Sequence, residues 1–355
     1  MKIGIVNDLA LAVEALRRAL RGHPEHTIVW TATDGGEAVA RCAQDPPDLV
    51  LMDLLMPNMD GVEATRLIMA HSPCAILVVT ASVDSNAPLV FQAMGYGAID
   101  AVDIPALVAD KEGIAALLAK IELIGRLTQV RPVMALQKQK QQKQKLPQPA
   151  AERLLAIGAS AGGPAALAQV LSGLPVKFPA AIVIVQHIDE KFARSMADWL
   201  HRYSKSPVRL ARPGDRPVAG TVLLAGTNQH LVLNSDGRLD YTCEPFDEPY
   251  RPSVDVFFDS INRAWPGQAV GVLLTGMGRD GAAGLKAMRL KGHHTIAQDQ
   301  ASCTVYGMPK AAAELDAAVQ RGGPVRDAGA GVPDARGVRA GRRHARPALR
   351  GQGAG

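Results

Sequence analysis

The chain has 355 residues, a length that predicts two or three domains. Hydrophobic residues make up 47% of it and charged residues 21%, as in ordinary soluble globular proteins. No apolar run approaches the roughly 20 residues that a membrane span needs, and the first one stops at Asn7, too early for a signal peptide. The cysteines form no C-x-x-C pair, which argues against a zinc site or a disulfide framework. We therefore predict a cytoplasmic protein without direct membrane insertion.

The net charge of +5 is unevenly distributed along the chain. Residues 131–150 carry a charge of +5 and residues 321–355 a charge of +6, which leaves −6 on the remainder. The first segment is rich in Gln, Lys and Pro and is predicted to be a linker, although a lysine run can also bind an acidic partner. The second is rich in Gly, Ala and Arg and is predicted to be a disordered tail. Because neither is a folded basic face, we expect no nucleic-acid partner.

Residues 1–125 alternate between predicted strands and helices. Short apolar runs at Lys2–Val6, Asp48–Met52 and Ala75–Thr80 read as strands, and Ala10–Leu20 has apolar residues at helical spacing. Runs that are apolar on both faces indicate a parallel sheet covered by helices, hence an α/β fold.

Polar side chains follow three of these strands. Asp8, Asp53 and Thr80 would meet at the carboxyl edge of a parallel sheet, where ligands bind in such folds. Two carboxylates suit Mg²⁺, which prefers oxygen ligands and would offset the charge of an incoming phosphoryl group. One carboxylate could then attack phosphorus while the hydroxyl binds a phosphoryl oxygen. A single Asp at a strand end is more often an ordinary loop residue.

The ordered set, with Asp53 inside LMDLLMPNMDG, resembles the receiver domain of two-component response regulators over about residues 1–122. The resemblance implies a flavodoxin-like, doubly wound parallel sheet. It makes Asp53 the phosphoacceptor, Thr80 the switch residue, and Asp8 and Asp53 the Mg²⁺ ligands. It also implies a CheA-type histidine kinase as phosphodonor.

Three positions depart from the receiver pattern. Asn7 stands where the family usually has the first acid of a pair. Ile104 replaces the lysine that precedes Pro105, and Ala101 replaces a common switch aromatic. A lysine at that position would pair with the phosphoryl charge and couple it to the fold, so switching is expected to be unusual.

Residues 153–320 form a second predicted α/β block. Arg153–Ile157, Ala181–Val185 and Val270–Leu274 are strand-like, and Pro309–Gln320 is predicted to be the last helix. We place the domains at 1–125 and 153–320, with a linker at 126–152 and the tail at 321–355.

A possible nucleophile, base and acid follow these strands. Ser160 lies in the small-residue turn GASAGGP, His187 directly ends the second strand, and Asp280 lies in the glycine-rich turn after the third. Together they supply the parts of a hydrolytic triad. Taken alone, the turn around Ser160 equally fits a phosphate or dinucleotide site, and a lone histidine is more often structural.

Five sequence blocks make the resemblance specific, in the order GASAGG, QH, RPSVD, TGMGRDG and QDQASCTVYGMP. They resemble the CheB-type protein-glutamate methylesterase domain over about residues 153–319. The resemblance implies a second doubly wound α/β domain that hydrolyses glutamate methyl esters on methyl-accepting chemotaxis receptors, releases methanol, and deamidates receptor glutamine. No cofactor is expected for this esterase. The opening MKIGIVNDLALAVEALRRAL and the missing lysine most resemble the Wsp-type branch.

The family implies specific roles for residues of this chain. Ser160 would be the nucleophile, His187 the general base and then acid, and Asp280 the orienting acid. The backbone N–H groups of Met277 and Ala161 would stabilise the oxyanion. The remaining histidines of the domain (His230, His293 and His294) are interpreted as structural or surface residues.

Three alternative functions share some of these features. A receiver-gated serine esterase or amidase with another substrate remains the main one, although the order Ser, His, Asp differs from that of α/β-hydrolases. A DNA-binding output would need a helix-turn-helix and a basic face, which residues 153–319 lack. An inert, receiver-gated adaptor is disfavoured by the complete triad.

Overall fold

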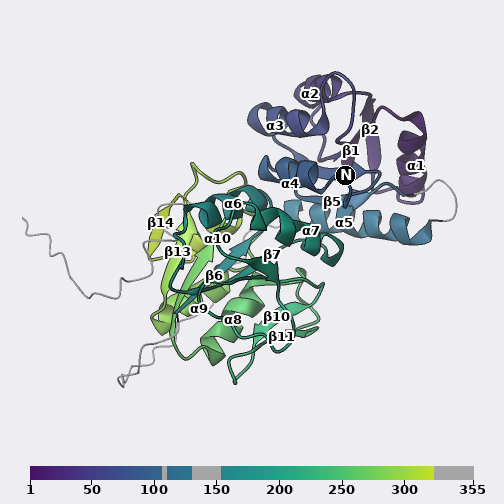
Figure 1. Cartoon of the computed structure of the whole chain (residues 1–355). Helices are drawn as coiled ribbons and strands as arrows, with labels where there is room; N and C mark the ends of the chain where they lie inside the picture. The colour runs from purple at the N-terminus through teal and green to yellow at the C-terminus, as the bar shows by residue number, and fades with distance from the viewer. Residues whose placement is uncertain (106–109, 130–152, 324–355) are drawn as a thin grey trace, which may run out of the picture.

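The computed structural model describes residues 1–105, 110–129 and 153–323, which form two α/β domains side by side (Figure 1). Residues 130–152 of the expected linker and most of the expected tail lie outside the described residues. The elements of the first domain are β1 (Lys2–Val6), α1 (Ala10–Leu20), β2 (Thr27–Ala32), α2 (Gly35–Gln44), β3 (Leu49–Met52), α3 (Gly61–His71), β4 (Ala75–Thr80), α4 (Ala87–Gly95), β5 (Asp100–Asp103) and α5 (Lys111–Gln129).

The first sheet has the order β2-β1-β3-β4-β5, with every pair parallel. Its central strands β3 and β4 are buried at every residue, as their unbroken apolar sequences require. One face packs on α1 and α5 and the other on α2, α3 and α4. This is the flavodoxin-like, doubly wound arrangement that was predicted, and its switch point lies between β1 and β3.

The second domain contains β6 (Arg153–Ala159), α6 (Gly163–Gly173), β7 (Ala181–Gln186), α7 (Glu190–His201), β8 (Val208–Leu210), β9 (Val222–Leu224), β10 (His230–Leu233), β11 (Leu239–Thr242), α8 (Val254–Ala264), β12 (Gln268–Leu273), α9 (Ala282–Lys291), β13 (His294–Gln298), α10 (Met308–Glu314) and β14 (Gln320–Gly322). Seven of these strands form a parallel sheet in the order β14-β13-β12-β6-β7-β9-β8, while β10 and β11 form a separate antiparallel hairpin.

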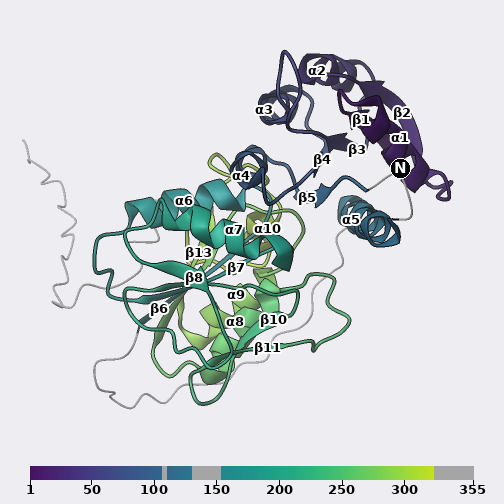
Figure 2. The same cartoon turned by 45° about the vertical axis from the view of Figure 1, so that its right-hand side comes forward.

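Strand β6 lies at the centre of this sheet, between β7 and β12. Its side chains alternate between two cores, because successive residues of a strand point to opposite faces. Leu155 and Ile157 join the cluster under α6 and α7, whereas Leu154 and Ala156 join the one under α8 and α9. Figure 2 shows these helix pairs on opposite sides of the sheet. The chain continues from β6 to β7 on one side and later adds β12 on the other side, so the switch point lies beside the carboxyl end of β6.

The C-terminal end of this domain differs from the prediction. The expected helix Pro309–Gln320 stops at Glu314, and residues 320–322 form the edge strand β14 instead. Asp316, with a φ of 51°, adopts a left-handed conformation that a helix cannot contain. Helix α5 in turn extends to Gln129, four residues beyond the expected end of the first domain at 125.

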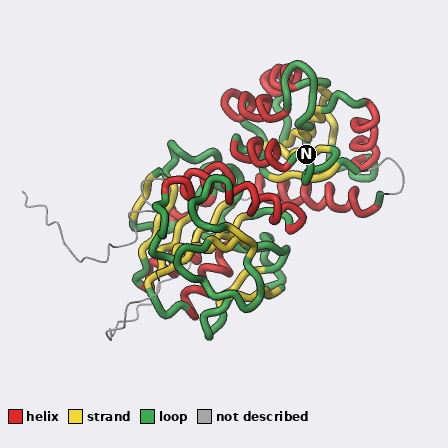
Figure 3. The backbone as a smooth tube through the Cα atoms, in the orientation of Figure 1, coloured by secondary structure: helices red, strands yellow, loops and turns green. Residues whose placement is uncertain are grey.

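The two domains pack through helix α4 of the first and helices α6 and α7 of the second, as the tube in Figure 3 makes visible. Phe91 on α4 is almost fully buried, and its ring centroid lies 5.6 Å from that of Trp199 on α7. One apolar cluster runs through both domains across this contact. No helix within the described residues is long and apolar enough to cross a membrane.

Candidate active site

Ser160 follows β6 in a turn that the backbone fixes closely. Its N–H donates to the carbonyl of Thr275 at 3.0 Å, and only 5% of the residue is exposed. Gly162 has a φ of 78°, which favours glycine, and helix α6 begins at the next residue. A Cβ at Gly276 would lie 2.8 Å from the Cβ of Ser160, so only a glycine lets the two turns come this close.

The carboxylate of Asp280 is held by the first turn of α8. Oδ1 accepts hydrogen bonds from Ser253 Oγ at 2.8 Å and from the N–H of Asp255 at 3.0 Å. Oδ2 accepts from the N–H of Val254 at 2.6 Å. Burial alone would raise the pKa of Asp280, but the hydrogen bond with His187 and those from the backbone outweigh it and lower the pKa. The acid is therefore ionised and fixed in place.

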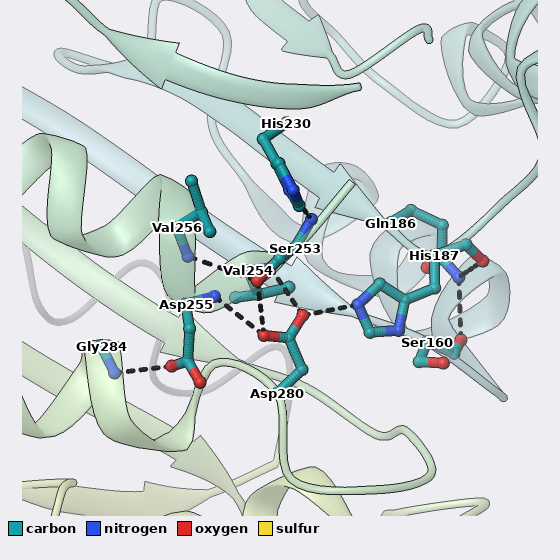
Figure 4. Close-up of polar contacts among 10 residues, drawn as sticks. All are labelled: Ser160, Gln186, His187, His230, Ser253, Val254, Asp255, Val256, Asp280 and Gly284. Atoms are coloured by element: carbon teal, nitrogen blue, oxygen red, sulfur yellow. Dashed lines mark hydrogen bonds and ion pairs between the residues drawn. The ribbon is translucent and has the colours of Figure 1, made fainter. Parts of the chain in front are cut away.

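The imidazole of His187 lies between this acid and Ser160 (Figure 4). Its Nε2 lies 2.7 Å from Asp280 Oδ2, so the neutral ring carries its proton on Nε2. Its Nδ1 is buried without a hydrogen-bond partner in the described structure and lies on the Ser160 side of the ring (Figure 4). The arrangement reverses the nitrogens of the serine-protease triad, in which the acid holds Nδ1.

Two side chains hold the neighbourhood of His187. The ring of Tyr250 stacks on the imidazole, with centroids 4.4 Å apart and planes 12° from parallel. The buried amide of Gln186 donates from Nε2 to the carbonyls of Ser160 at 2.9 Å and His187 at 3.1 Å, which ties the ends of β6 and β7 together. A Cβ at Gly163 would lie 2.1 Å from Gln186 Oε1, so this turn needs a glycine there.

The expected oxyanion donors lie in the two turns that meet at Ser160. The N–H groups of Ala161 and Met277 donate no hydrogen bond within the described residues. Thr275 Oγ1 donates to the carbonyl of Ala161 at 2.9 Å and so joins the two turns. Neither N–H group is thus occupied by another described residue, and Ala161 is itself fully buried.

A cavity of about 410 Å³ lies over Ser160 and His187, and both domains line it. Tyr250 and Arg251 line it from the second domain, and Lys120 with other residues of α5 from the first. The first domain also contacts the serine turn directly, because the carbonyl of Met94 accepts the N–H of Gly162 at 2.9 Å. The first domain therefore covers the site.

Three further contacts hold this cover in place. Lys120 forms an ion pair with Asp100 of its own domain and lies 3.9 Å from Asp189 of the other. Its ammonium also lies 6.0 Å from the centroid of the Phe192 ring. Ser195 Oγ donates to Asp84 Oδ1 at 3.1 Å across the same boundary.

The edge of the first sheet brings the expected acids together. Asp53 is buried after β3, where Oδ2 accepts from Asn7 Nδ2 at 2.9 Å and Oδ1 from the N–H of Leu54 at 2.7 Å. Burial raises the pKa of Asp53, and the nearby charge of Asp8 raises it further against the lowering effect of the backbone hydrogen bonds. Thr80 is buried on the next strand and accepts from Asn86 Nδ2 at 3.0 Å.

Apolar side chains occupy the two positions where the receiver pattern has a lysine and an aromatic residue. Ile104 is half-buried and packs against the cluster under α1 and α5, and its N–H donates to the carbonyl of Thr80 at 2.9 Å. Ala101 is buried. The described residues place no lysine or arginine in an ion pair with Asp53.

The carboxylates fit the divalent cation that a receiver domain uses for phosphorylation. Asp8 and Asp53 are close enough for one charge to raise the pKa of the other, and a cation between them would relieve that repulsion. The described residues contain no cluster of three or more His, Cys, Asp or Glu side chains suited to a metal. The fit therefore rests on these two acids.

Several residues that hold the side chains of this site in place were given no role from the sequence. Ser253 lies in the RPSVD block, which was a visible signal without an assigned function. Gln186 likewise belonged to a block in which only the histidine was assigned. Tyr250 precedes the RPSVD block and has no pattern that identifies it, because its stacking partner lies 63 positions earlier in the chain.

Comparisons with known proteins match both domains. The model of the CheB methylesterase family matches residues 155–329, and that of the response regulator receiver domain matches residues 3–110. A Pseudomonas aeruginosa protein named protein-glutamate methylesterase/protein-glutamine glutaminase 3 is 60% identical over 326 residues, covering 90% of this chain and 95% of its own. Protein-glutamate methylesterase/protein-glutamine glutaminase 4 of Burkholderia thailandensis is 60% identical over 320 residues, covering 90% of this chain and 93% of its own.

Among solved structures, the catalytic domain of the Thermotoga maritima CheB methylesterase aligns with 33% identity and a TM-score of 0.47, covering 50% of this chain and 95% of that one. The chain belongs to the CheB family of receiver-linked methylesterases, on the strength of its full-length relatives.

Proposed function

We propose that Ser160, His187 and Asp280 carry out ester hydrolysis in this protein-glutamate methylesterase and protein-glutamine glutaminase, whose activity follows from its close relatives. The observation that carries the assignment is the pairing of His187 Nε2 with an anchored Asp280 while Nδ1 stays free beside Ser160. Substrates are glutamate methyl esters on chemoreceptors, and the output is adaptation in chemotaxis-like signalling.

The reaction follows from the protonation states. Ser160 Oγ attacks the ester carbonyl carbon as its proton passes to His187 Nδ1. The same nitrogen then returns that proton to the leaving methoxy oxygen, which releases methanol and leaves an acyl-serine. Water attacks the acyl-serine with the same proton transfers, yielding glutamate and free Ser160. With a glutamine substrate, ammonia leaves in place of methanol.

Asp280 and the turn N–H groups stabilise the charges of this reaction. The ionised carboxylate orients the imidazole and stabilises the imidazolium that forms during attack. The N–H groups of Ala161 and Met277 are proposed as donors to the oxyanion of the tetrahedral intermediate. Their lack of other partners supports this role.

The first domain is proposed to gate access to Ser160. Its α5 lines the cavity over the triad, and Met94 occupies the N–H of Gly162. Phosphorylation of Asp53 would shift the domain and open the cavity. Thr80 is the proposed switch residue that binds a phosphoryl oxygen.

Asp8 and Asp53 are proposed as the ligands of Mg²⁺ at the receiver edge. The cation supplies positive charge that offsets the phosphoryl group during transfer. Asp53 supplies the attacking carboxylate oxygen, and Asn7 holds that side chain in place. A CheA-type histidine kinase is the proposed phosphodonor.

The finer placement of the chain is also a proposal. A cytoplasmic location is supported by the kinase and receptor partners that the family uses. The Wsp-type branch is supported by the opening sequence and by Ile104. The domain limits 1–125 and 153–320 are retained as proposals, with α5 extending beyond the first.

Replacing Ser160 by alanine tests the assignment of the triad. We expect Ser160→Ala to stop methanol release from methylated receptor, measured with a phosphodonor present, while the unfolding curve is unchanged. Full methanol release by this variant would overturn the assignment. Methanol release by the wild type only from small esters would instead favour a different natural substrate.

A further inference from the structure

The imidazole of His230 is fully buried at the start of β10, and the reaction above gives it no role. Its Nδ1 accepts a hydrogen bond from the backbone N–H of Ser253 at 3.1 Å. Its Nε2 donates to the carbonyl oxygen of Pro245 at 3.2 Å. A neutral imidazole has one acceptor and one donor, so a single tautomer satisfies both contacts. Burial lowers the pKa of His230, which keeps the ring in this neutral form.

Ser253 connects this histidine to the acid of the triad. It is the N-cap of α8, and its Oγ accepts the N–H of Val256 at 3.3 Å while donating to Asp280 Oδ1 at 2.8 Å. A hydroxyl has a single proton, so its donation to Asp280 is fixed by these two contacts. Figure 4 shows the continuous series of hydrogen bonds from His230 through Ser253 and Asp280 to His187.

The first turn of α8 thus determines where the Asp280 carboxylate lies. Three of the four hydrogen bonds to its carboxylate come from residues 253–255, and the fourth comes from His187. His230 joins that turn to β10 and to the loop that contains Pro245. Because a misplacement of about 1 Å can cost about 100-fold in rate, a group that fixes this turn also affects the reaction.

We infer that His230 is a positioning residue for the hydrolase, which holds Ser253 and, through it, the Asp280 carboxylate in line with His187. The inference rests on the proposed triad and adds a residue that touches neither substrate nor reacting atoms. An ordinary buried histidine would contribute to stability alone. Substituting a positioning residue must also change the turnover number, by an amount that depends on which hydrogen bond is lost.

Two amide substitutions separate the two contacts of the ring. In His230→Asn the amide oxygen can take the place of Nδ1 and accept the N–H of Ser253, while the contact with Pro245 is lost. In His230→Gln the amide nitrogen can take the place of Nε2 and donate to Pro245, while the contact with Ser253 is lost. His293→Gln, at a half-buried histidine outside the site, is the matched control.

The experiment measures kcat and KM for methanol release from methylated receptor membranes, using the full chain with a phosphodonor. We expect His230→Gln to lower kcat about 10-fold or more with KM within twofold of wild type, and His230→Asn to stay within about threefold of the wild-type kcat. Equal losses in both amide variants, or a comparable loss in His293→Gln, would overturn the positioning role.

A double variant tests whether His230 acts through Ser253. Ser253→Ala removes the hydroxyl that binds Asp280, so His230→Gln should lower kcat less in that background than in the wild type. Fully multiplicative effects would mean that His230 acts elsewhere.

Asp280→Asn distinguishes this inference from the triad itself. Normal activity of Asp280→Asn would overturn the triad, whereas an inactive Asp280→Asn beside a fully active His230→Gln would overturn only the positioning role.

Discussion

Asp280 and Asp53 both follow a buried strand of a parallel sheet, yet their surroundings act on them in opposite directions. Asp280 accepts a serine hydroxyl, two backbone N–H groups and His187, which together lower its pKa despite burial. Asp53 accepts hydrogen bonds from the Asn7 amide, from Thr80 and from backbone N–H groups, yet burial and the nearby charge of Asp8 raise its pKa. The donors around Asp280 offset the cost of burying its negative charge, whereas those around Asp53 offset that cost only in part.

The difference fits the roles proposed for the two acids. Asp280 keeps its charge throughout the proposed reaction, so a fixed set of donors serves it best. In the proposed phosphorylation, Asp53 would gain and lose a phosphoryl group, and a bound cation would offset the repulsion from Asp8. Because Ile104 stands where the receiver pattern has a lysine, this edge of the sheet also lacks the positive charge of that lysine.

Exchanging each acid for its amide should give the largest contrast. Asp280→Asn removes the charge that orients His187, and we expect kcat for methanol release to fall by about 10⁴-fold. Asp53→Asn should leave the activity without phosphodonor unchanged and should remove the stimulation by phosphodonor. A stimulated Asp53→Asn variant would show that this acid is not the phosphoacceptor.

Loosening the contact between the two domains should raise the unstimulated activity. Lys120→Gln removes the charge that approaches Asp189 and Phe192, so the receiver should leave the cavity more often, with about a 10-fold rise in methanol release without phosphodonor. Arg126→Gln is the matched control, since Arg126 lies exposed on the same helix and pairs with Glu122. Equal activity in the two variants would contradict the proposed gating.

Changing Tyr250 should have a smaller effect that depends on its ring. Tyr250→Phe keeps the aromatic face on His187, while Tyr250→Leu removes it. Loss of the stacking contact is worth about 1 kcal/mol, so we expect a roughly fivefold lower kcat in the leucine variant. A larger loss in Tyr250→Phe would instead assign the function to its buried hydroxyl, which has no partner in the described structure.

Stability should respond to the two acids with opposite signs. The raised pKa of Asp53 means that the wild type loses stability as the pH rises through that pKa, so Asp53→Asn should be the more stable protein at neutral pH. Below the usual pKa of an aspartate the difference should vanish. The lowered pKa of Asp280 has the reverse effect, so Asp280→Asn should be less stable at neutral pH, and the loss should shrink as the pH falls through that pKa.

Urea unfolding at several pH values measures both differences. Adding Mg²⁺ should raise the melting temperature of the wild type and leave that of Asp53→Asn nearly unchanged, since a ligand stabilises the state that binds it. Equal shifts in the two proteins would contradict the cation site at Asp53.

The sequence by itself determined the two α/β domains and the strand ends that carry their polar residues. Apolar runs such as those of β1 and β4 have the same limits in the structure as in the prediction, because burial on both faces leaves a continuous hydrophobic signal. Small residues around Ser160 and the order of motifs placed Ser160, His187 and Asp280 at neighbouring strand ends. Local pattern was sufficient there because parallel topology brings strand ends together.

Tertiary structure decided the features that depend on contacts between distant segments. Which nitrogen of His187 meets Asp280, and that Tyr250 stacks on the ring, depend on side-chain directions that no spacing encodes. The short strand β14 forms only because β13 offers its edge, so the sequence Gln320–Gly322 carries no signal of its own. The first domain covers Ser160 because α4 and α5 pack on the second domain, and the sequence of neither domain reveals this contact alone.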